Sequence, residues 1–123
     1  MPEPGLGLDL VDIDRLERAL SRRPRLADRL FTPAELEFAA ARRWPARHLA
    51  VRFAAKEAAI KALGSSVSPR QVEVRGGGTA PPSLALHGRA AELADERGVE
   101  LQVALTHTDE TAAAVVLAVP VGQ

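Results

Sequence analysis

Apolar residues alternate with small or polar residues at the start of the chain. Leucines stand at positions 6, 8 and 10, with Gly7 and Asp9 between them. A period of two is typical of a half-buried β-strand, because successive side chains point to opposite faces. The pattern predicts a strand over residues 6–10 in which Asp9 points away from the leucines.

A helical spacing of apolar residues follows this strand. Ile13, Leu16 and Leu20 recur at intervals of three and four, which places them on one face of a helix. Asp12 has the side chain of an N-cap residue. We therefore expect a short helix after Asp12 that stops near Pro24.

Local capping residues predict two further helices. Thr32, Pro33 and Glu35 have the N-cap, first-turn and N3 identities of a capping box, so a helix should begin at Pro33. This helix should end before the Trp-Pro pair at 44–45. Pro45 should open a longer helix that runs to Leu63 and is stopped by Gly64.

Strand patterns dominate the second half of the chain. We expect strands over residues 71–75, 83–87, 99–106 and 112–119, a helix over 89–97, and a glycine- and proline-rich turn over 76–82. An N-terminal strand, then helices, then mainly antiparallel strands predicts an α+β fold, with one domain over residues 1–123.

Composition excludes several classes of protein. None of the 123 residues is cysteine, so the chain can form no disulfide, thiolate metal site or cysteine nucleophile. No apolar run approaches the ~20 residues that span a bilayer, and Met1 to Pro4 lack the features of a signal peptide. We expect a cytoplasmic protein with no membrane partner.

Charge is balanced in number but uneven along the chain. Sixteen basic and sixteen acidic residues cancel, yet residues 15–52 carry ten arginines against four acids. Such a region either attracts an acidic partner or is a solvated surface. Nucleic acid is not the expected partner, because neither a docking motif nor an aromatic stacking platform is present.

The only two lysines, Lys56 and Lys61, lie in the predicted long helix. At ~100° per residue Lys56 falls within the apolar stripe of this helix and Glu57 borders it. The expected stripe consists of Leu49, Phe53, Ile60 and Leu63. Buried charges need a partner or a metal. One interpretation is a simple ion pair between Glu57 and Lys61, which are four residues apart.

A second interpretation brings Asp9 to the same place. Two carboxylates, from Asp9 and Glu57, suit Mg²⁺, which takes one or two carboxylates and completes its octahedron with water and substrate phosphate. The two lysines would then bind that phosphate as point charges. Taken alone, Asp9 is better explained by a turn or cap role at the end of a strand, and His107 by a turn residue in a hairpin link.

Taken together, these residues resemble a known family. The chain resembles the holo-acyl-carrier-protein synthases, the small type of 4′-phosphopantetheinyl transferase. The matching segments are Gly5 to Asp9 with Arg15, Arg52 to Glu57 with Lys61 and Gly64, and Leu105 to Thr108. Their order and spacing agree along nearly the whole chain.

The resemblance implies an activity and an assembly. It implies Mg²⁺-dependent transfer of the phosphopantetheine arm from coenzyme A to a serine of an apo acyl carrier protein, in a homotrimer whose active sites lie between adjacent subunits. The carrier could serve fatty acid, polyketide or peptide synthesis. The alternative is a non-catalytic module of the same fold that binds coenzyme A or a carrier protein.

The resemblance also implies a role for each matching residue. Asp9 and Glu57 would bind Mg²⁺ and form the catalytic group together with Lys61. The residues expected to contact coenzyme A are Arg52, Lys56, Lys61, Gly64 and His107. The arginines expected to receive the acidic recognition helix of the carrier are Arg15, Arg22 and Arg25.

Overall fold

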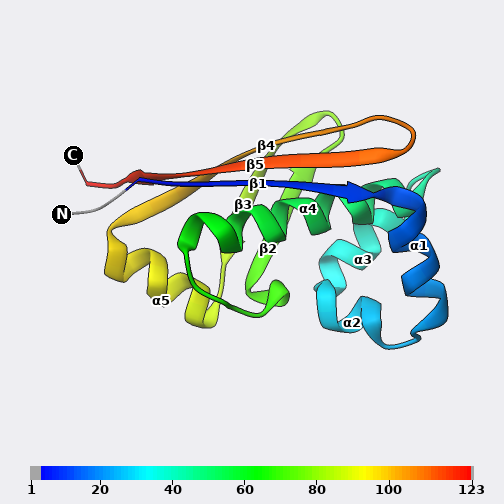
Figure 1. Ribbon diagram of the computed structural model, residues 1–123, viewed down its shortest axis with the longest axis horizontal. Helices are drawn as coiled ribbons and strands as arrows, with labels where there is room; N and C mark the ends of the chain where they lie inside the picture. The colour runs from blue at the N-terminus through cyan, green and yellow to red at the C-terminus, as the bar shows by residue number, and fades with distance from the viewer. Residues whose placement is uncertain (1–3, 123) are drawn as a thin grey trace.

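A computed structural model describes residues 4–122 of the chain (Figure 1). Residues 1–3 and 123 belong to the expected domain over 1–123, and the first three also to the expectation that no signal peptide is present; they lie outside the described residues. In chain order the elements are β1 (Gly5–Asp12), α1 (Ile13–Arg22), α2 (Leu26–Leu30), α3 (Pro33–Ala40), α4 (Pro45–Leu63), a 3₁₀ turn (Pro69–Gln71), β2 (Val72–Gly77), β3 (Ala80–Leu86), α5 (Gly88–Arg97), β4 (Val99–His107) and β5 (Thr111–Pro120).

The strands form two antiparallel sheets, as the α+β prediction requires. The larger sheet has the order β1-β5-β4, with Asp9 opposite Ala114 and His107 opposite Ala112. The smaller sheet pairs β2 with β3. The helices lie on one side of the larger sheet, with α4 directly against β1 and β5 (Figure 1).

The predicted helix boundaries are confirmed where local capping defines them. Thr32 and Glu35 form the capping box at the start of α3. Gly64 ends α4 with φ +73°, a conformation that other residues rarely adopt. Within residues 4–122, no helix has the length and apolar character needed to cross a membrane.

Two segments differ from the sequence prediction. The short helix α2 was not expected, because five residues show too little periodicity to be recognised. The expected turn over 76–82 is mostly strand: β2 continues to Gly77 and β3 begins at Ala80. Prolines are tolerated here because a two-stranded sheet consists only of edge strands.

Alanine, rather than the expected stripe of large apolar residues, forms the buried surface of α4. Of that stripe Leu63 is fully buried, whereas Leu49, Phe53 and Ile60 are only half-buried. The alanines at 50, 54, 55, 58, 59 and 62 are buried instead. Small residues were favoured because β1 lies very close: a Cβ atom on Gly7 would collide with the Ala58 carbonyl.

The two faces of β1 have opposite surroundings. The face with Gly7, Asp9 and Val11 lies towards α4, so Asp9 does point away from the leucines. The leucine face is bare, with Leu6 and Leu10 each 67% exposed. Val115 and Leu117 on β5 are also exposed, so the larger sheet presents an apolar outer face.

Candidate active site

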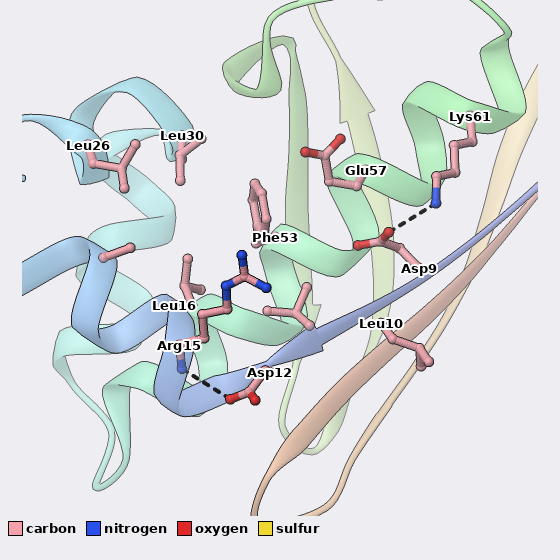
Figure 2. A pocket seen from close by; sticks show the side chains of 12 residues that line it. Asp9, Leu10, Asp12, Arg15, Leu16, Leu26, Leu30, Phe53, Glu57 and Lys61 are labelled. Carbon is pink, nitrogen blue, oxygen red and sulfur yellow. Dashed lines mark hydrogen bonds and ion pairs between the residues drawn. The ribbon is translucent and has the colours of Figure 1, made fainter.

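Asp9 and Lys61 meet where β1 crosses α4. Lys61 Nζ donates to Asp9 Oδ1 and to the Leu8 carbonyl oxygen, both at 3.0 Å. Figure 2 shows Asp9 reaching from β1 towards Lys61 on α4. The side chain of Lys61 is 57% exposed and that of Asp9 19%. This ammonium group is therefore accessible to a ligand that enters beside Asp9.

Glu57 lies one turn before Lys61 on the same helix and lines the same cavity. Burial raises the pKa of Glu57, the negative charge of Asp9 raises it further, and Lys61 opposes the shift. Among residues 4–122 Lys61 forms its ion pair with Asp9 rather than with Glu57. A carboxylate whose proton affinity is raised by a neighbouring carboxylate belongs to a site that a cation would stabilise.

A cavity of about 730 Å³ joins these three side chains to an apolar wall. The wall consists of Leu16 from α1, Leu26 and Leu30 from α2, and Phe53 from α4, as Figure 2 shows. The contribution of α2 was not predicted from the sequence, because a helix of five residues is too short to show a period. A charged end beside an apolar wall suits a ligand that carries phosphate at one end and an uncharged chain at the other.

The arginines expected to bind the carrier have different positions. Arg15 lines the cavity, and its backbone N–H donates to the capping side chain of Asp12 at 3.1 Å. Arg22 is exposed in the last turn of α1. Arg25 lies just before α2, in a separate open hollow with Arg29 and Arg70. Of the three, only Arg15 contributes to the lining of the cavity with Asp9, Glu57 and Lys61.

Arg52 and His107 line a second cavity, of about 240 Å³. Arg52 is almost fully buried, donates to the Gly76 carbonyl oxygen at 2.8 Å and stacks on Phe38 with its guanidinium carbon 3.7 Å from the ring centroid. Its Nε is buried without a partner among the described residues. His48 lines the same cavity, and burial together with nearby positive charge lowers its pKa. Such a cavity is suited to an anion.

Lys56 lies in neither cavity. Its side chain is completely buried, and its ammonium group is held by Glu35 and by two backbone carbonyl oxygens. In this conformation its donors are used within the chain, and its expected contact with coenzyme A stays a prediction. Gly64 also lies outside both cavities, and its contact with coenzyme A stays a prediction.

The metal site expected from Asp9 and Glu57 has a minimal set of protein ligands. Within residues 4–122 no group of three or more His, Asp or Glu side chains is placed to hold a metal. Two carboxylates still fit Mg²⁺, which commonly keeps several waters and takes further oxygens from substrate phosphates. They do not form a closed structural metal site.

Comparison with known proteins gives a consistent result. A family model described as the 4′-phosphopantetheinyl transferase superfamily matches residues 5–116. The holo-[acyl-carrier-protein] synthase of Moorella thermoacetica is 47% identical over 115 residues, which cover 90% of each chain.

Solved structures match over the same length. The ACPS-CoA complex of Chronobacterium ammoniagenes has a TM-score of 0.82 at 32% identity and covers 94% of this chain and 96% of its own. The acyl carrier protein synthase of Mycobacterium tuberculosis has a TM-score of 0.77 at 35% identity, with the same coverage of both chains. The chain therefore belongs to the 4′-phosphopantetheinyl transferase superfamily and is a transferase of the holo-[acyl-carrier-protein] synthase type.

Proposed function

We propose that this chain transfers the 4′-phosphopantetheine group of coenzyme A to a serine of an apo acyl carrier protein, with Mg²⁺ held between Asp9 and Glu57. The observation that carries the proposal is the convergence of these two carboxylates and Lys61 at one cavity, although they come from β1 and α4. Relatives named as holo-[acyl-carrier-protein] synthases and relatives solved with coenzyme A support it.

The transfer breaks a phosphoanhydride bond of coenzyme A and forms a phosphoester bond to the serine. The serine oxygen forms a bond to the β-phosphorus, and the bond from that phosphorus to the oxygen of the leaving adenosine 3′,5′-bisphosphate breaks. When bound, Mg²⁺ supplies charge stabilisation on the phosphate oxygens. Lys61, which now donates to Asp9, would donate to the same oxygens from α4.

The proton of the serine also needs an acceptor. We propose a water molecule held by Asp9 or Glu57 in this role. On the side of α1 and α2 the wall of the cavity is apolar, which favours the exclusion of water once a substrate is bound.

We propose that the active form is a homotrimer. The apolar outer face of the larger sheet supports association with further copies, because contiguous exposed leucines mark an interaction surface. The separation of Asp9, Glu57 and Lys61 from Arg52 and His107 supports a site shared between subunits, in which the second cavity of one copy serves coenzyme A bound at the first cavity of its neighbour. Light scattering on the purified chain tests this assembly.

The carrier protein should approach along α1 and α2. Arg15, Arg22 and Arg25 would pair with its acidic residues, so the KM for the carrier should rise with ionic strength. A KM that stays constant as salt increases would refute this docking surface. We place the reaction in the cytoplasm, as expected from the cysteine-free sequence.

The decisive experiment incubates the purified chain with coenzyme A, Mg²⁺ and a panel of apo carriers from fatty acid, polyketide and peptide synthesis. Intact-protein mass spectrometry should show the addition of one phosphopantetheine group to at least one carrier. The control replaces the acceptor serine of the carrier with alanine. If coenzyme A binds but no carrier gains mass, the chain is the non-catalytic binding module instead.

A further inference from the structure

A buried ion pair stands apart from the proposed active site. Lys56 Nζ lies 2.6 Å from Glu35 Oε1, and both side chains are 0% exposed. Burying two charges has a desolvation cost that is recovered only when the geometry is good and the remaining hydrogen-bonding groups are satisfied. A pair of this kind therefore indicates a specific requirement at this position.

Every hydrogen-bonding group of the pair has a partner. The three donors of Lys56 go to Glu35, to the Pro69 carbonyl oxygen at 3.0 Å and to the Val72 carbonyl oxygen at 2.7 Å. Glu35 also accepts from the backbone N–H groups of Thr32 and Val74, each at 2.8 Å. The pair thus ties the start of α3, the middle of α4 and the start of β2 to one point.

The rest of the α4 surface gives little directional information. Its buried side chains are mostly alanine, and β1 approaches it through Gly5 and Gly7. The contact between α4 and β1 consists of methyl groups and glycine backbone, with few large side chains that interlock. Packing with few interlocking side chains specifies a position poorly, whereas buried polar networks specify one geometry.

The orientation of α4 matters for the metal site. Glu57 follows Lys56 directly, and its side chain forms no hydrogen bond or ion pair within residues 4–122. The position of its carboxylate therefore depends on how α4 is rotated against β1. Asp9 belongs to β1, so the separation of the two carboxylates follows the same rotation.

We propose that Glu35 and Lys56 form a positioning unit that fixes the rotation of α4 on β1 and thereby the geometry of Asp9 and Glu57. On this proposal neither residue contacts coenzyme A. The inference rests on the proposed Mg²⁺ site and adds to it two residues that act through the helix and not on the substrate. Glu35 was expected from the sequence only as a capping residue, so its second role is new.

The test separates positioning from stability. In Lys56→Met the Glu35 carboxylate is left buried without its partner, and a large loss of stability is expected. In the double variant Glu35→Gln/Lys56→Met both charges are removed together, so the melting temperature should recover most of this loss. The affinity of this double variant for Mn²⁺ without coenzyme A should nevertheless fall by about tenfold or more. Electron paramagnetic resonance of the free ion measures this affinity.

A matched control uses an exposed pair of the same charge types. Arg89 donates to Glu96 at 3.3 Å on the surface of α5. The double variant Arg89→Met/Glu96→Gln should leave the melting temperature and Mn²⁺ binding at their wild-type values. The KM for coenzyme A of the Glu35→Gln/Lys56→Met variant, measured at saturating Mg²⁺, should also be unchanged.

Each contrary result overturns the proposal in a different way. A Glu35→Gln/Lys56→Met variant that is stable and binds Mn²⁺ like the wild type would refute positioning. A variant with normal Mn²⁺ affinity but a raised KM for coenzyme A would show that Lys56 contacts the substrate. Failure of the wild-type chain to bind Mn²⁺ would refute the metal site on which the proposal rests. This outcome is measured on the wild type alone and is therefore distinct from the results with the variants.

Discussion

The two lysines of α4 differ in almost every physical respect. Lys56 is completely buried and held by three acceptors, whereas Lys61 is 57% exposed and reaches Asp9 at the edge of a cavity. They are five positions apart in the helix, which turns their side chains about 140° apart. One side of α4, with Lys56, thus faces the interior of the protein, and another side, with Lys61, faces the proposed site.

This difference shows that neighbouring residues of a motif need not share a task. A buried ammonium group must be fully paired, so it has no donor left for a ligand. For an ammonium group at the surface, the free-energy cost of exchanging one anionic partner for another is small. The two flanks of α4 therefore divide into a structural side, towards α3 and β2, and a chemical side, towards β1 and α1.

Removing the partner of Lys61 should have the largest effect. Asp9→Ala leaves Glu57 as the single carboxylate of the proposed metal site, so Mg²⁺-dependent transfer should fall by roughly 100-fold or more. Initial rates with an apo carrier measure this loss. Asp14→Ala, an exposed acid on α1, is the control and should keep the wild-type rate. Near-normal transfer by Asp9→Ala would show that the side of α4 towards β1 does not take part in the reaction through Asp9.

The same substitution at both lysines sharpens the contrast in stability. Lys56→Met should lower the free energy of unfolding by about 3–5 kcal/mol, because it leaves a buried carboxylate without its partner. Lys61→Met should lower it by less than about 1 kcal/mol, because its ion pair is solvent-exposed. Urea denaturation followed by circular dichroism gives both values. Equal losses of unfolding free energy in the two variants would contradict the assignment of a structural role to Lys56 and a chemical role to Lys61.

Activity should respond in the opposite order. Folded Lys61→Met should lose kcat by roughly 10- to 100-fold, since a charge that stabilises the transferred phosphate is missing. Folded Glu35→Gln/Lys56→Met should regain wild-type kcat at saturating Mg²⁺. Steady-state kinetics at several Mg²⁺ concentrations separates the two cases. Full activity of Lys61→Met would show that the exposed lysine is not part of the chemistry.

A smaller effect should appear in the pH dependence of stability. Burial and Asp9 raise the pKa of Glu57 in the folded chain, so protonation of Glu57 favours folding. The contribution of this protonation to the stability of the folded chain is complete below the ordinary glutamate pKa of about 4.3. It is lost as the pH rises through the pKa of Glu57 in the folded chain. Without divalent cations, Glu57→Gln should therefore melt higher than the wild type at pH 7, and the difference should vanish in acid.

The control for this measurement is Glu37→Gln, which changes an exposed glutamate on α3. Its melting temperature should follow that of the wild type across the same pH range. A Glu57→Gln variant less stable than the wild type at pH 7 would indicate that Glu57 has a cationic partner in the folded chain that strengthens its charged form.

Local sequence patterns predicted those parts of the fold that local chemistry determines. The capping box of Thr32 and Glu35, the proline at 45 and Gly64 define helix ends within a few residues of chain, and each is found where it was expected. The helix α2 was missed because its five residues contain too few positions to show a period. The buried face of α4 was misjudged because the close approach of β1 through Gly7 favours alanine.

The candidate site was predictable in part. Asp9, Glu57 and Lys61 were expected together and do line one cavity. The helical wheel also placed Lys56 on a buried face, where a partner was required. The identity of that partner could not be predicted, because Glu35 already had a local explanation as the N3 residue of a helix and its contact with Lys56 depends on how α3 packs on α4.

The central claim is that one metal ion binds between the carboxylates of β1 and α4. Crystals of the chain grown with coenzyme A and Mn²⁺, which prefers the same oxygen ligands as Mg²⁺, would locate the ion by its anomalous scattering. The account predicts an anomalous peak within coordination distance of both Asp9 and Glu57, with Lys56 still bound to Glu35. A metal peak away from these carboxylates, or Lys56 turned onto the nucleotide phosphates, would contradict it.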